Sequence, residues 1–88
     1  MNYKIIDKTI LLSLDKDAFI NESIKKVFEQ EKLRFGWVSG IGAIHNAHLG
    51  FYDVGNKRYV DKVFEEDHEL LSLSGNVTYL ESEYFVHT

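Results

Sequence analysis

The sequence predicts an α+β domain in which one helix packs on a mostly antiparallel sheet. Only residues 18–33 have the apolar spacing of an amphipathic helix. The segments after them are rich in β-branched and aromatic residues and are separated by turn residues, as is typical of strands joined in hairpins. A chain of 88 residues builds one small core at most, so we expect a single domain over residues 1–88.

The helix is predicted from four apolar residues that recur at i, i+4, i+7 and i+8, which places them on one helical face. They are Ile20, Ile24, Val27 and Phe28. Aspartate is a favoured helix N-cap, and Asp15 and Asp17 lie just before this segment. We therefore expect one of these two carboxylates to cap the helix.

Strands are predicted on both sides of the helix. The second and third of those after it flank a turn at 54–57, which predicts a hairpin. The region 69–79 is either a strand pair or one long strand bent near Gly75. Three glycines at 36, 40 and 42 indicate bends, bulges or close approach of the backbone. The predicted strands are residues 10–14, 35–44, 47–52, 58–64, 69–79 and 84–88.

Composition and charge narrow the class of partner. Ten Lys and Arg face fourteen Asp and Glu, giving a net charge of −4, whereas DNA-binding domains carry a basic surface that displaces counterions. Cysteine is absent, which excludes disulfides and thiolate metal sites. No apolar run reaches the length of a membrane span, and no signal-peptide core follows Met1. We expect a cytoplasmic protein that is by itself a poor DNA binder.

Four separate blocks carry a resemblance, in order and with compatible spacing. They are Val38-Ser39-Gly40-Ile41-Gly42-Ala43, Ala47-His48-Leu49-Gly50-Phe51-Tyr52-Asp53, Leu71-Ser72-Leu73-Ser74-Gly75-Asn76-Val77 and Phe85-Val86-His87. Together they make the chain similar to the PPC domain (plants and prokaryotes conserved). The resemblance implies a helix packed on a largely antiparallel sheet and assembly as a homotrimer. It also implies kinship with stand-alone prokaryotic members that are labelled DNA-binding and have no settled activity.

The chain departs from the family in two respects. Plant members place the domain after an AT-hook that grips the minor groove, but no such basic segment precedes Tyr3. DNA binding therefore does not carry over. Family members also continue from a His-x-His pattern through further strands to a Gly-Gly-His segment. We therefore expect the chain to be the N-terminal two-thirds of the family's domain, incomplete after Thr88.

The histidines are the candidate metal ligands: His45, His48, His68 and His87. A catalytic zinc usually takes three protein ligands. His45 and His48 lie at a strand connection, where their spacing places them on opposite faces and disfavours joint chelation. His87 is the candidate we select, because the resemblance makes it the first histidine of the His-x-His pair. Zinc or another divalent metal is then expected in the full-length family member, and a polar strand-end histidine is the alternative.

Other chemistry-bearing residues favour structural roles. Gly40-Ile41-Gly42 lacks the third glycine of a dinucleotide fingerprint and follows the only helix instead of preceding one. Ser39, Ser72 and Ser74 lie in strands, and no nucleophile elbow surrounds them. The acidic run at 65–69 is typical of a solvated corner. The aromatic residues Trp37, Tyr52 and Tyr59 are expected in the core or in a trimer interface.

These observations predict a PPC-family assembly and interaction domain with no catalytic residues of its own. The alternative is a metal-dependent, histidine-ligated enzyme or a small-molecule binder.

Overall fold

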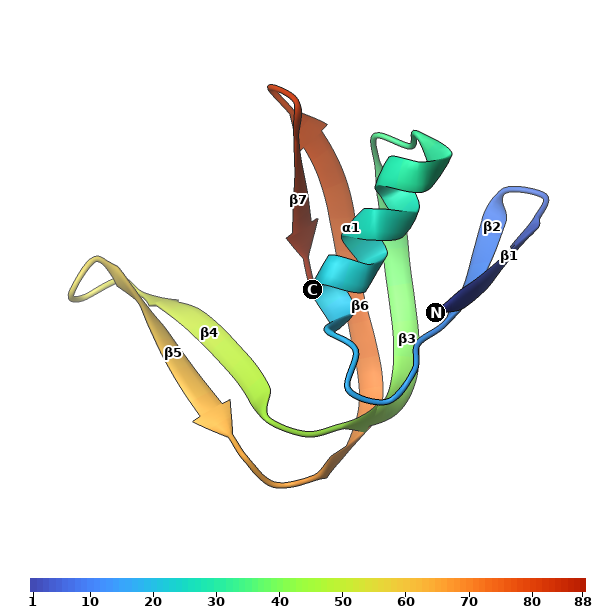
Figure 1. Ribbon diagram of the computed structural model, residues 1–88. Helices are drawn as coiled ribbons and strands as arrows, with labels where there is room; N and C mark the ends of the chain where they lie inside the picture. Colours follow the sequence, from blue (N-terminus) through green and yellow to red (C-terminus); the bar gives the residue numbers. More distant parts are fainter. The chain divides into compact units, whose positions relative to one another are not determined.

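The computed structural model describes residues 1–88 as one helix and seven strands (Figure 1). Three strands form a sheet in the order β3-β6-β7, and the other four form the pairs β1-β2 and β4-β5. The pairs β1-β2, β4-β5 and β6-β7 are antiparallel. The predicted α+β class, with one helix and a mostly antiparallel sheet, is confirmed. In chain order the elements are β1 (Asn2–Ile6), β2 (Thr9–Ser13), α1 (Ile20–Glu31), β3 (Gly36–Ile44), β4 (Ala47–Asp53), β5 (Arg58–Phe64), β6 (His68–Leu80) and β7 (Glu83–His87).

Contacts divide the chain into two compact units. The first unit comprises Met1–Ser39 and Ser74–Thr88, and the second comprises Gly40–Leu73. Strands β3 and β6 are long enough to contribute residues to both units.

The core lies in the first unit, where α1 packs on one face of the sheet (Figure 1). Ile24, Phe28 and Val77 form its centre, and Val77 is only 1% exposed. The predicted apolar face of the helix is confirmed, because Ile24, Val27 and Phe28 are buried. Partly buried side chains complete the cluster: Leu12, Ile20, Val38, Tyr84 and Val86.

The predicted helix cap is wrong. The N-cap residue is Phe19, and no side chain caps the first turn. Asp15 is used elsewhere, because its carboxylate contacts the amino group of Met1 and its carbonyl accepts a hydrogen bond from the Ala18 N–H at 3.2 Å. Asp17 adopts a left-handed conformation with φ of 68°. A turn thus separates both carboxylates from the free N–H groups of the helix.

Strand β1 was not predicted from the sequence, since Ile5 and Ile6 interrupt the alternation of a half-buried strand. It pairs with β2 and connects to α1 through Tyr3. The Tyr3 hydroxyl donates to Glu31 at 2.6 Å and to Gln30 at 3.1 Å. The hydrogen bond to the Glu31 carboxylate raises the pKa of Tyr3 above its ordinary value.

The region 68–80 is one continuous strand, which settles the choice left open by the sequence. Strand β7 pairs with its second half, from Asn76 opposite His87 to Leu80 opposite Glu83. Gly75 lies where the chain passes His87, and a Cβ built there would run into the His87 carbonyl oxygen. A close approach also explains Gly36, since its Cβ would lie 2.9 Å from the Phe28 ring.

In the second unit, β4 and β5 form the predicted hairpin, with Asp53 opposite Arg58 at its end. The Asp53 carboxylate accepts hydrogen bonds from the Gly55 N–H at 3.0 Å, the Asn56 N–H at 3.3 Å and the Asn56 side-chain amide at 2.8 Å. These bonds, led by that of the Asn56 side chain, lower the pKa of Asp53 below its ordinary 3.8. Aspartate holding its own turn in this way is a common device of loops.

Replacing Asp53 by alanine should therefore loosen the hairpin turn. We expect faster hydrogen exchange at the Gly55 and Asn56 amides, measured by NMR at pH 7, and no such change in the matched variant Asp67→Ala. Because the folded-state pKa of Asp53 is depressed, its stabilisation is present above pH 3.8 and is lost as the pH falls through the lower folded value. Unchanged exchange in Asp53→Ala would show that the turn forms without this carboxylate.

Candidate functional site

The histidines do not converge. His45 lies in the connection between β3 and β4, and His48 lies on β4 opposite Val63. His68 begins β6, and its Nδ1 lies 3.0 Å from the Glu66 carbonyl oxygen. No group of three or more His, Cys, Asp or Glu side chains is arranged to hold a metal ion.

His87 lies at the exposed end of β7, opposite Asn76. It supplies one imidazole, whereas a zinc site needs three or four protein ligands. The residues around it therefore do not by themselves fit a metal centre.

The glycine-rich segment is a strand and not a phosphate-binding loop. Gly40 and Gly42 lie within β3, and no helix follows them. A Cβ built at either position would meet no atom within 4 Å, so the close approach expected from these glycines occurs at Gly36 alone.

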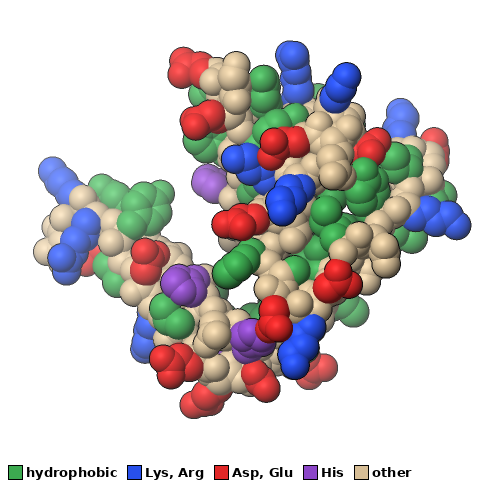
Figure 2. Space-filling model, viewed as in Figure 1, with side chains coloured by type: hydrophobic (Ala, Val, Ile, Leu, Met, Phe, Trp, Pro, Cys, Tyr) green, Lys and Arg blue, Asp and Glu red, His purple; other side chains and the backbone are tan.

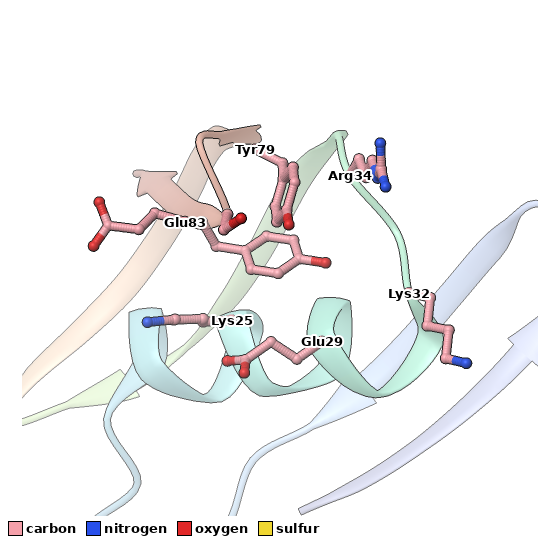
Figure 3. Close-up of a pocket in the computed structure, with 8 residues that line it drawn as sticks. Lys25, Glu29, Lys32, Arg34, Tyr79 and Glu83 are labelled. Atoms are coloured by element: carbon pink, nitrogen blue, oxygen red, sulfur yellow. The ribbon is translucent and has the colours of Figure 1, made fainter.

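A polar cleft of about 600 Å³ lies in the first unit, between α1 and the hairpin of β6 and β7 (Figure 3). Its lining comprises three cations, two carboxylates, two tyrosines and a serine. These residues are Lys25, Glu29, Lys32, Arg34, Tyr79, Ser82, Glu83 and Tyr84. No ion pair joins its charged groups.

A chain of ring contacts fixes one wall of this cleft. The Tyr84 hydroxyl donates to the Leu33 carbonyl at 2.6 Å, and the Tyr84 ring meets Phe28 edge-on at 6.4 Å. Tyr79 packs against Tyr84 with ring centroids 4.8 Å apart. The Arg34 guanidinium lies over the Tyr79 ring, 5.2 Å from its centroid. The position of Arg34 is thus tied to the core through two rings.

The second unit carries apolar side chains that nothing covers. We call residues 47–64, which form β4, β5 and their turn, the hairpin arm. No residue of Gly40–Leu73 is buried. Phe51 is 61% exposed on one face of the arm, and Tyr59 is 74% exposed on the other, where it packs edge-on against Tyr52. Figure 2 shows hydrophobic side chains gathered on the surface of this arm.

A second apolar surface lies in the first unit, on the sheet face opposite α1. Because side chains alternate along a strand, the neighbours of core residues point to the other face. We call this surface the helix-free face. It presents Trp37, which is 88% exposed, together with Leu80 and Phe85, and Thr78 lies opposite Phe85 in the register. Trp37 therefore lies outside the core, and its expected place in a trimer interface stays a prediction.

Sequence reasoning identified neither surface nor cleft. The hairpin arm carries apolar residues on both faces, and this is also the sequence pattern of a buried pair of strands. The cleft joins residues that are far apart in the chain, such as Lys25 and Ser82. Its one local signal is the i, i+4 spacing of Lys25 and Glu29, which places them on one side of α1.

The fold and these surfaces define a small α+β domain with one core, two uncovered apolar surfaces and no helix that could span a membrane. Over residues 1–88 the chain matches the family model described as the Plants and Prokaryotes Conserved (PCC) domain. No curated protein matches it significantly. The chain therefore belongs to the plant- and prokaryote-conserved (PPC) domain family.

Three solved structures are similar to the chain. A provisionally named DNA-binding protein from Bacteroides thetaiotaomicron is 28% identical with a TM-score of 0.92, over 98% of this chain and 60% of that one. A metal-containing protein from Archaeoglobus fulgidus is 38% identical with a TM-score of 0.78, over 84% and 53%. A PPC protein from Pyrococcus horikoshii is 31% identical with a TM-score of 0.72, over 77% and 48%. The chain thus spans about half to three-fifths of the length of these relatives.

Proposed function

We propose that the chain is an assembly and interaction domain that forms a homotrimer in the cytoplasm. The observation that carries this proposal is the hairpin arm, whose two faces both present large apolar side chains to solvent. An isolated two-stranded hairpin is at best marginally stable in water and needs a covered apolar face. Nothing in Gly40–Leu73 is buried, and in this proposal a second copy of the chain supplies the cover.

The free energy gained by removing apolar side chains from water favours burial of the arm. Fully burying one phenylalanine stabilises by about 1.5–3 kcal/mol. Phe51 and Leu49 lie on one face of the arm, and Tyr52 and Tyr59 pack on the other. Covering these side chains therefore favours association.

A ring of three copies requires an interface between two different surfaces, because an isologous contact of one surface with itself closes as a dimer. The chain offers two such surfaces, the hairpin arm and the helix-free face. We infer that the arm of one copy covers the helix-free face of the next. In a trimer this contact would occur three times, once for each copy, and would cover the helix-free face and one face of the arm.

The single tryptophan of the chain reports on this contact. Because Trp37 lies on the helix-free face and is 88% exposed in one copy, assembly should bury it. We expect its fluorescence emission to lie at short wavelength in concentrated protein and to shift to longer wavelength on dilution into the dissociated range. Free tryptophan diluted in parallel is the control. Emission typical of a solvated indole at every concentration would contradict the arrangement.

DNA binding is a second candidate, favoured only by the name of the Bacteroides relative. The net charge of −4 opposes it, because binding to phosphates depends on released counterions and hence on Lys and Arg. A titration with duplex DNA at low salt, where nonspecific binding is strongest, decides whether this chain binds by itself.

A histidine-ligated metal site remains the alternative prediction for His87. The Archaeoglobus relative is a metal-containing protein, which supports a metal in this family. This chain offers His87 as a single imidazole without further ligands nearby, so the alternative depends on ligands from elsewhere. The metal content of the purified protein after dialysis tests it.

A further inference from the structure

The polar cleft between α1 and the β6–β7 hairpin has the size of a ligand site. Its volume of about 600 Å³ lies within the range of small-molecule pockets, which is roughly 300–1,000 Å³. All its residues belong to the first unit, so it is complete within that unit of one chain. Its properties are therefore independent of the proposed assembly.

Two hydrogen-bond donors on one wall are positioned but unused. The Arg34 guanidinium lies over the Tyr79 ring, 5.2 Å from its centroid, and makes no ion pair within the chain, and the Tyr79 hydroxyl makes no hydrogen bond. The ring of Tyr79 is held by Tyr84, whose hydroxyl is anchored on the Leu33 carbonyl. An arginine that makes no ion pair within the chain has N–H donors available for a planar, two-pronged acceptor.

The charges favour an anionic ligand over a cationic one. Three cations and two carboxylates line the cleft, which gives it a positive excess in a chain of net charge −4. In Figure 3 the carboxylate of Glu83 is directed away from the Tyr79 ring, and the charged groups of Lys25 and Glu29 lie on the helix and are directed away from Arg34.

We propose that this cleft binds a small oxyanion, a carboxylate or phosphate group, through the Arg34 guanidinium and the Tyr79 hydroxyl. Arginine holds such a group by two parallel hydrogen bonds, and the tyrosine donates a third. Both donors enter the complex already ordered, which reduces the entropy lost on binding.

The probes are inorganic phosphate and malonate, added separately at constant ionic strength and followed through the backbone amide NMR signals of Ser82 and Glu83. We expect saturable shifts with at least one probe and none with sodium chloride alone. A response to phosphate only, or to malonate only, identifies which oxyanion the cleft prefers. The absence of a saturable shift with both probes would overturn the proposal.

Three variants separate a specific site from general attraction. Arg34→Gln should weaken binding about tenfold or more, since hydrogen bonds to charged groups contribute about 1.5–3 kcal/mol. Arg34→Lys keeps the charge but loses the two-pronged geometry, so its affinity should fall between those of Arg34→Gln and the parent chain. Arg58→Gln, which removes the other arginine of the chain, is the matched control and should change the affinity less than about twofold.

If Arg34→Gln and Arg58→Gln weakened the binding of the probe equally, the site would be contradicted, because binding would then depend on the net charge of the chain alone. An unchanged amide signal for buried Val77 in each variant verifies that the core is intact. Failure of this proposal would leave the oligomeric state unaffected, so the two proposals are tested separately.

Discussion

Replacing Phe28 by alanine should lower the free energy of unfolding by about 3–5 kcal/mol, the usual loss for a buried phenylalanine. Phe28 is only 8% exposed and contributes to the one core cluster of the chain, together with Ile24 and Val77. Its ring also contacts Tyr84 edge-on and approaches the backbone at Gly36. A domain this small has a total stability near the lower end of about 5–15 kcal/mol, so most of it would be lost.

The matched control is Phe19→Ala at the start of the same helix. Phe19 is the N-cap residue, and its side chain is 73% exposed, so the expected change is within about 0.5 kcal/mol. Denaturant unfolding followed by far-UV circular dichroism measures both variants. Equal losses of stability in the two variants would mean that the core does not depend on Phe28.

Replacing Phe51 by glutamate should dissociate the assembly. The substitution places a charge in the centre of the hairpin arm, opposite Val60. Interface positions of this kind contribute about 2 kcal/mol or more, so we expect the dissociation constant to rise about 30-fold or more. Tyr59→Glu, on the opposite face of the arm, should have a comparable effect if both faces are covered.

The control for these variants is Lys57→Glu, which adds a carboxylate to the exposed turn of the same arm. It should leave the dissociation constant within about twofold of the parent value. Since Phe51 and Tyr59 are exposed within one chain, the helical signal of the first unit should persist in all three variants. Sedimentation equilibrium over a concentration series provides the constants. An effect of Tyr59→Glu no larger than that of Lys57→Glu would leave only one face of the arm in the interface.

The sequence predicted local structure well where the spacing of apolar and turn residues distinguishes a helix from a hairpin. The helical face of Ile24, Val27 and Phe28 was predicted correctly, as was the hairpin around the 54–57 turn. The prediction from sequence failed where one sequence pattern is compatible with two different local structures. An aspartate before a helix can cap it or form a turn, and the contact of Asp15 with the Met1 amino group, fourteen positions away, could not be foreseen from local sequence.

The candidate sites were less predictable than the fold. The cleft combines Lys25 of α1 with Arg34, Tyr79 and Tyr84, and only the packing of α1 on the β6–β7 hairpin brings them together. The exposure of Trp37 and Phe51 could not be predicted from the sequence either, because aromatic residues in strands indicate burial. The sequence shows four histidines but not the distances between them, and in the fold they form no group of three or more possible metal ligands.

The molar mass in solution shows whether the chain assembles as a homotrimer. Light scattering coupled to size-exclusion chromatography measures the molar mass of the purified chain at micromolar concentration. We expect a single species of three times the chain mass of 10.2 kDa. A species with the mass of one chain would contradict it, because the hairpin arm and the helix-free face would then remain uncovered in solution.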